Sequence, residues 1–103
     1  MTLDDYQHAA TRTINPALSE RDRLLDAAAG LAEEAGELLG LVRKRVMQGR
    51  DFPRERVLQE LGDALWCLSV AAATAGFSLD EVAKANIAKL GARHPNGFSV
   101  PNP

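Results

Sequence analysis

Two short acidic motifs carry the side chains of this sequence that could do chemistry. Glu34 and Glu37 lie three residues apart, and Glu60 and Asp63 repeat that spacing further along the chain. Residues three apart are neighbours on one face of an α-helix, where like charges repel. No lysine stands four residues after any of these acids, so an ordinary helical ion pair does not explain them. One such pair is typical of a solvated helix face, but two pairs within apolar runs favour a site for a cation.

Apolar residues around each motif predict the helices that position the acids. In the first helix the spacing of the apolar residues places Glu34 at the border of a stripe and Glu37 just beyond it. In the second helix Glu60, Asp63 and Cys67 fall on the flank of a stripe. The two stripes that we expect to face the core are Leu24, Ala28, Leu31, Ala35, Leu38 and Val42, and Leu58, Leu61, Leu65, Leu68 and Ala72.

If these two helices pack antiparallel, the four carboxylates can converge on one point. Their repulsion should make at least one of them hold its proton more tightly than in the unfolded chain, unless a multivalent cation neutralises the cluster. Oxygen ligands suit Mg²⁺ or Mn²⁺ and argue against zinc.

Capping residues and breakers predict four helices in an all-α chain that forms a single domain, residues 1–103. We expect helices from Thr2 to about Ile14, from Glu20 to about Met47, from Pro53 to about Ala75, and from Ser78 to about Leu90. Gly49, Gly76 and Gly91 are the expected stops, and residues 94–103 should form an irregular tail. The sequence contains no alternating run of β-branched residues that would predict a strand.

Composition narrows the classes of function. A net charge of −2 with no basic tract argues against a nucleic-acid partner. The polar start of the chain does not resemble a signal peptide, and the longest apolar run, Ala64 to Ala75, is too short to cross a membrane. The single cysteine, Cys67, fits a reducing compartment, so we expect a cytoplasmic protein. Because 65–75 is apolar nearly all round in so short a chain, we also expect a homodimer or homotetramer.

Together the motifs resemble those of the MazG-like nucleoside triphosphate pyrophosphohydrolases. The resemblance covers nearly the whole chain. It rests on Glu33-Glu34-x-x-Glu37, on Glu60-x-x-Asp63 with Trp66 close behind, and on the C-terminal runs Asn86 to Leu90 and Arg93 to Phe98.

The resemblance implies a helical bundle completed by oligomerisation, and Mg²⁺-dependent hydrolysis of nucleoside triphosphates to the monophosphate and pyrophosphate, as in nucleotide-pool housecleaning. It also implies roles for individual residues. Glu33 would bind a further metal ion or position water, and Cys67 departs from relatives that carry an aromatic residue there, so their base preference does not transfer. The implied metal ligands are Glu34, Glu37, Glu60 and Asp63, and the implied substrate contacts are Asn86, Lys89 and Arg93.

Two other functions stay open on the sequence. A phosphoribosyl-ATP pyrophosphatase shares the helical scaffold, and a non-catalytic module could bind a divalent cation for assembly. A di-iron bundle is disfavoured, because it needs Glu-x-x-His pairs and both His8 and His94 lie outside the acidic motifs.

Overall fold

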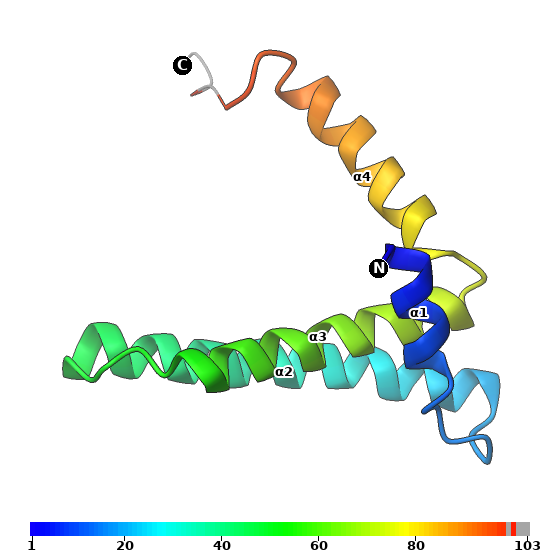
Figure 1. Cartoon of the computed structure of the whole chain (residues 1–103), viewed down its shortest axis with the longest axis horizontal. Coiled ribbons are helices and arrows are strands. Elements are labelled where there is room, and N and C mark those ends of the chain that lie inside the picture. The colour runs from blue at the N-terminus through cyan, green and yellow to red at the C-terminus, as the bar shows by residue number, and fades with distance from the viewer. Residues whose placement is uncertain (99, 101–103) are drawn as a thin grey trace.

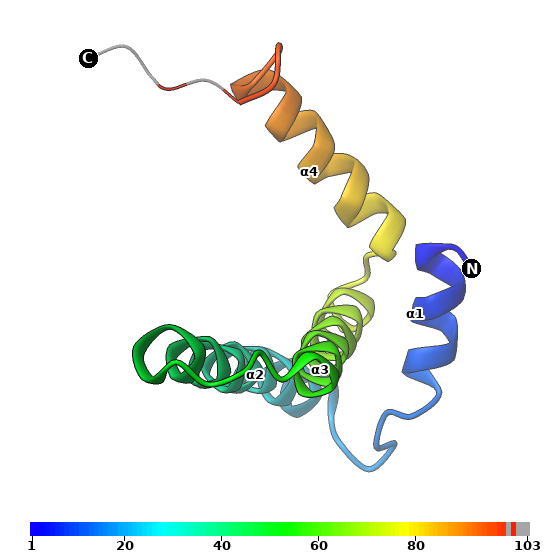
Figure 2. The same cartoon turned by 60° about the vertical axis from the view of Figure 1, so that its left-hand side comes forward.

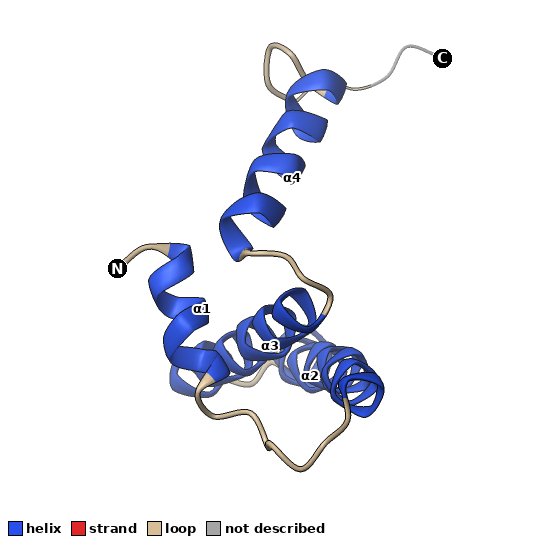
Figure 3. Ribbon diagram, turned by 90° about the vertical axis from the view of Figure 1, so that its right-hand side faces the viewer, coloured by secondary structure: helices blue, strands red, loops and turns tan. Residues whose placement is uncertain are grey.

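The computed structural model describes residues 1–98 and residue 100, and it is all-helical over that part of the chain (Figure 3). The four helices are α1 (Leu3–Thr11), α2 (Glu20–Gln48), α3 (Arg54–Thr74) and α4 (Leu79–Arg93). The described residues contain no strand, only an isolated bridge between Pro95 and Gly97. The prediction of an all-α chain with four helices is confirmed.

Side-chain caps begin three of the helices as expected. Thr2 and Ser78 each form a complete capping box, with Asp5 and Glu81 respectively, and Ser19 accepts a hydrogen bond from the Asp22 N–H. α2 ends at Gln48, and the capping residue that follows, Gly49, adopts the left-handed conformation (φ 65°) that glycine reaches without steric cost. The predicted stop at Gly49 is therefore confirmed.

Two predicted helix ends are wrong. α1 ends at Thr11 rather than near Ile14, because the hydroxyls of Thr11 and Thr13 donate to the carbonyls of the preceding turn, at 3.2 and 2.7 Å. α4 passes through Gly91 and ends at Arg93. A glycine inside a helix costs only about 1 kcal/mol, whereas Pro95 disfavours the helical conformation at the residue before it. The expected tail at 99 and 101–103 lies outside the described residues.

The long helices α2 and α3 lie side by side and antiparallel, and the other two helices attach at one end of this pair (Figures 1 and 2). α1 contacts α3 and α4, while α4 leaves the end of α3 with a bend of 100° between their axes. Over the described residues, no Cα atom of α4 lies within 8 Å of α2. The Cα radius of gyration is 16.7 Å, against about 13 Å for a compact domain of about 100 residues. The single chain is therefore an open arrangement.

The face of α3 that packs against α2 is not the one predicted. The predicted leucine stripe is largely exposed, and it is α3's other flank, with Glu60 and Cys67, that faces α2. The helices approach closely where Gly30 meets Cys67, because a Cβ atom on Gly30 would lie 2.9 Å from Cys67 Sγ. Small residues at this crossing favour that flank over the bulky leucines. The exposed leucines are Leu58 (61%), Leu61 (51%), Leu65 (36%) and Leu68 (39%).

The buried side of α2 is also rotated from the predicted stripe. Ala27 and Leu41 are buried, and Leu31, Glu34 and Leu38 are half-buried. Leu24, Ala28, Ala35 and Val42 are exposed. Glu34 thus lies within the contact with α3 rather than at its border.

Gln7 fixes the junction where α1, α3 and α4 meet. Its buried amide donates to the carbonyls of Ser69 (3.3 Å) and Phe77 (3.0 Å) and accepts from the Leu79 N–H (2.9 Å). Beside it, Asp4 accepts from the Asp80 N–H at 3.1 Å. These bonds hold the first turn of α4, and they set the direction in which the rest of that helix leaves the pair.

No single helix of the described chain is long and apolar enough to span a membrane; α3 and α4 reach the required length and composition only as a bent pair.

Candidate metal centre

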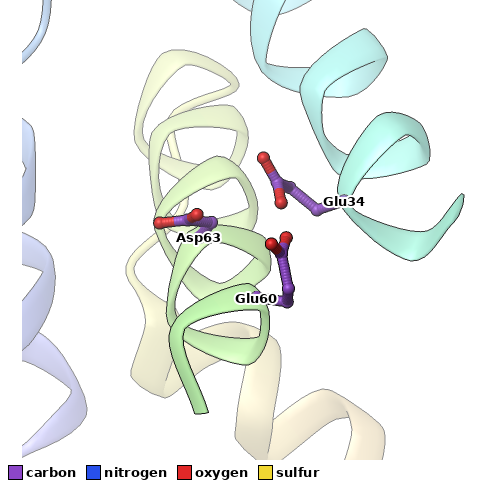
Figure 4. Close-up of side chains that lie close together, drawn as sticks. All are labelled: Glu34, Glu60 and Asp63. Carbon is purple, nitrogen blue, oxygen red and sulfur yellow. The ribbon is translucent and has the colours of Figure 1, made fainter. Parts of the chain in front are cut away.

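Three carboxylates from the two long helices converge between α2 and α3 (Figure 4). Glu34 comes from α2, and Glu60 and Asp63 come from α3, where their spacing puts them on neighbouring turns. One oxygen atom from each residue lies within 4.8 Å of the other two. Glu34 and Glu60 are half-buried and Asp63 is exposed, so the cluster opens to solvent on one side.

The electrostatics of the cluster are unfavourable without a cation. The pKa of Glu34 rises to about 7, because its carboxyl shares a hydrogen bond with Glu60, is partly desolvated, and is repelled by Glu60, Asp63 and Glu33. A carboxyl that holds its proton near neutral pH is the expected result of crowding like charges. The prediction that one of the acids binds its proton more tightly is confirmed at Glu34.

The donor set fits a hard divalent cation. The three donors are all carboxylate oxygens, and ligand oxygens lie about 2.0–2.1 Å from Mg²⁺, so small side-chain rotations bring this cluster onto one ion. Thiolate ligation is disfavoured, since burial and then Glu34 raise the pKa of the nearby Cys67 thiol.

Glu33 and Glu37 lie beside this cluster but are not part of the group of three. Both are exposed on α2, and both line a surface hollow of about 380 Å³ between α2 and the start of α3. The metal-ligating role implied for Glu37 stays a prediction, as does the role of Glu33.

The three implied substrate contacts on α4 are remote from the acids of α2. Asn86 lines an apolar hollow between α1, α3 and α4, in the company of Leu65 and Leu68. Lys89 and Arg93 are exposed further along the helix. Within one chain, α4 therefore brings none of the three towards Glu34.

Trp66 and Cys67, on the helix that carries Glu60 and Asp63, have structural explanations. The indole N–H of Trp66 donates to the Thr13 hydroxyl at 2.7 Å, which ties α3 to the segment after α1. Cys67 is buried, as its interpretation as a small apolar residue predicted. Burial, followed by repulsion from Asp63, raises the pKa of Tyr6 above its usual value.

The sequence interpretation missed two cations near the acids. Lys44 on α2 and Arg56 on α3 line the same hollow as Glu33 and Glu37. Lys44 belongs to a basic run that the dipole of α2 explains on its own, so it carried no signal. Gly36 and Gly40, which precede it by eight and four residues, line the same hollow.

Comparison with known families agrees with the acidic motifs. The family model described as the MazG nucleotide pyrophosphohydrolase domain matches residues 24–98, which include both motifs and the whole of α4. The chain belongs to the MazG family. Neither the curated proteins nor the solved structures that were searched contain a match to it. The description of this family indicates nucleotide pyrophosphohydrolysis as the type of reaction at this site.

Proposed function

We propose that this protein hydrolyses nucleoside or deoxynucleoside triphosphates to the monophosphate and pyrophosphate, and that it requires Mg²⁺ or Mn²⁺. The observation that carries the proposal is the convergence of Glu34, Glu60 and Asp63, whose oxygens lie within 4.8 Å of one another. Membership of the MazG family supports the reaction type. A role in clearing unwanted nucleotides from the cellular pool follows from the same proposal.

Each acid has a proposed task. Glu34, Glu60 and Asp63 hold the divalent ion, which when bound supplies a positive centre that offsets the phosphate charge and polarises the α-phosphoryl group. Glu37 is a further ligand from the next turn of α2. Glu33, in the same hollow, orients the attacking water by accepting its hydrogen bond. The half-buried position of Glu34 and Glu60 strengthens these interactions, since part of the competing solvent is removed.

We also propose that the active form is a homodimer or homotetramer. Leu58, Leu61, Leu65 and Leu68 expose one continuous side of α3, and α4 exposes Ile87 and Leu90. An apolar surface of this kind is typical of a subunit interface. In the proposed assembly α4 of one copy would lie against the acids of another, so that Asn86, Lys89 and Arg93 would contact the phosphates there.

The test of the reaction is an assay that separates the products. Wild-type protein with Mg²⁺ should release pyrophosphate and a monophosphate from a panel of common and damaged triphosphates, and excess chelator should abolish turnover. Glu60→Gln should be inactive while remaining folded. Glu55→Gln is the matched control, since it removes an exposed carboxylate from the first turn of the same helix and should keep full activity.

The same panel separates the remaining alternatives. Turnover of phosphoribosyl-ATP in preference to every triphosphate would replace the proposed substrate. An assembly module would show no hydrolysis at all, and its oligomeric state would change when Mg²⁺ is removed.

Sedimentation at micromolar concentration tests the assembly. Wild type should sediment as a dimer or tetramer, and Leu61→Arg should give a folded smaller species, because Leu61 is half-exposed in the single chain. A folded wild-type monomer that hydrolyses triphosphates at the same concentration would refute the assembly and leave the reaction standing.

A further inference from the structure

The hollow between α2 and α3 joins acidic side chains to basic ones. Glu33 and Glu37 lie at one end of its α2 wall and Lys44 at the other, and Arg56 lines it from α3. A second hollow of about 250 Å³ shares Lys44 and Arg56 and continues towards Arg50 and Asp51 in the turn between the two helices. The two cations therefore stand between the carboxylate cluster and the α2–α3 turn.

Neither cation is explained by an ion pair. In the part of the chain that the structure describes, the single ion pair within 4.0 Å joins Lys84 to Asp80 on α4. Lys44 and Arg56 thus leave Glu33 and Glu37 unpaired although all four line one hollow. Acidic and basic side chains that line one hollow without pairing can both contact a bound ligand, the acids through a cation and the bases directly.

Helix dipoles do not explain Arg56 either. It is the third residue of α3, and the positive end of a helix dipole disfavours a cation there. Lys44 lies near the carboxyl end of α2, where the dipole favours it, so Arg56 is the more informative of the two. A guanidinium in an unfavourable position is better explained by an anion that it binds.

The wall between the two charged ends is formed by two glycines and Leu41. Gly36 and Gly40 line the hollow, and a Cβ atom built on either would meet nothing within 4 Å. Gly40 lies between Glu37 and Lys44 on one stripe of α2, at spacings of three and four residues. A ligand can therefore lie against the helix backbone from the acids to the cations.

The dimensions suit a polyphosphate. Lys44 follows Glu34 of the cluster by ten residues and Glu37 by seven, which correspond to about 15 and about 10 Å along the axis of α2. Arg56 precedes Glu60 by four residues, or about 6 Å along α3. Because α2 and α3 run antiparallel, both displacements point towards the same turn. A phosphate chain held at the carboxylates through a divalent ion would place its far phosphates at the two cations.

We propose that Lys44 and Arg56 bind the pyrophosphate end of the triphosphate substrate, with Gly36 and Gly40 as the floor of this subsite. The proposal rests on the proposed function, and it adds a position for the leaving group. Arg56 can offer two parallel N–H donors to a phosphate, and Lys44 acts as a point charge.

Binding of inorganic pyrophosphate tests the subsite without turnover. Isothermal titration of the full chain with pyrophosphate, at fixed Mg²⁺, should show Kd raised by about 10-fold in Lys44→Ala and in Arg56→Ala, and more in the double variant. Arg43→Ala is the matched control. It removes a cation from the neighbouring position of α2 that lines neither hollow, so it should bind as wild type.

Filling the floor gives a second variant that keeps both cations. A Cβ atom at position 40 would meet nothing within 4 Å, so Gly40→Leu should fold and still lose pyrophosphate affinity. In steady-state assays Lys44→Ala, Arg56→Ala and the double variant should raise KM for the triphosphate more than they lower kcat.

The outcomes separate the subsite from the reaction. Unchanged pyrophosphate affinity and KM in the double variant, with normal hydrolysis by wild type, would overturn the subsite alone. An equal loss in Arg43→Ala would also overturn it, since general charge would then suffice. Loss of pyrophosphate binding confined to Lys44 and Arg56, in a protein that hydrolyses no triphosphate, would support the subsite and refute the proposed reaction.

Discussion

Gln7 and Glu34 are both polar side chains placed within helix contacts, but their surroundings differ. The Gln7 amide is 8% exposed and meets two carbonyls and one N–H at 2.9 to 3.3 Å. The Glu34 carboxyl meets Glu60 and Asp63, which carry charge of its own sign. Every partner of Gln7 complements it, whereas each carboxylate beside Glu34 repels it once both are ionised.

The difference separates a structural polar group from one arranged for a ligand. A buried amide whose hydrogen bonds are made stabilises the fold and defines one geometry. Crowded carboxylates cost stability unless a cation binds them, so their presence indicates a role other than folding. Substitutions at the two places should therefore move stability in opposite directions.

The largest effect is expected at Glu34. Residues that only orient a metal ligand typically cost about 10–100-fold when mutated, so Glu34→Gln, which removes a proposed ligand, should lower kcat/KM by at least about 100-fold. The metal-free variant should melt at a higher temperature than wild type, because one charge leaves the cluster. Thermal unfolding beside a pyrophosphate-release assay measures both. A variant that keeps its activity would remove Glu34 from the site.

The next largest effect is expected at Gln7, with the opposite sign. Gln7→Ala leaves the Phe77 carbonyl and the Leu79 N–H without this partner at the junction of α1, α3 and α4, and it removes the added bond to the Ser69 carbonyl. It should lower the free energy of unfolding by about 2–4 kcal/mol. Urea unfolding measures it, and His8→Ala, at the exposed neighbouring position, is the control. A loss equal to that of the control would mean that these bonds contribute nothing.

Alanine substitutions at two glycines of α2 should also change stability in opposite directions, with smaller effects. Gly30→Ala should destabilise by about 1–3 kcal/mol, because its Cβ would lie 2.9 Å from Cys67 Sγ. The added substitution Cys67→Ala should recover part of this loss. Gly36→Ala meets nothing within 4 Å and should stabilise by up to about 1 kcal/mol through helix propensity. Equal effects of the two alanines in urea unfolding would contradict the close approach at Gly30.

The smallest effect is expected from pH, because water screens the half-exposed carboxyl of Glu34. Its pKa is about 7 in the folded chain, above the ordinary value of 4.5, so the folded state binds the proton more tightly. That contribution is complete below about pH 4.5 and fades as pH rises towards and through about 7. The metal-free protein should therefore weaken over this interval.

Glu34→Gln should remove that dependence, and Mg²⁺ should restore stability at neutral pH by binding only the folded state. Thermal unfolding at a series of pH values, with and without Mg²⁺, checks both. If the stability of the metal-free wild type changed from pH 5 to pH 7 in the same way as that of Glu34→Gln, the proton on Glu34 would contribute nothing to stability.

Local sequence was sufficient for the helices and for the acids themselves. Capping residues such as Thr2 and Ser78, and the left-handed glycine at Gly49, act within one turn, so their effect can be predicted without the rest of the chain. The spacing of Glu60 and Asp63 is likewise a property of one helix. The pairing of these acids with Glu34 followed once two adjacent helices were expected to pack antiparallel.

Only the tertiary structure decided which faces meet. The leucine stripe of α3 predicted the core by periodicity, yet the close approach of Gly30 and Cys67 selects the other flank. The hydrogen bonds of Gln7 join it to groups more than 60 residues away in the sequence. They fix the first turn of α4 so that this helix points away from the acids. Lys44 and Arg56 share a hollow because two helices fold back on each other. These features depend on contacts between distant segments, and helical periodicity describes only one segment at a time.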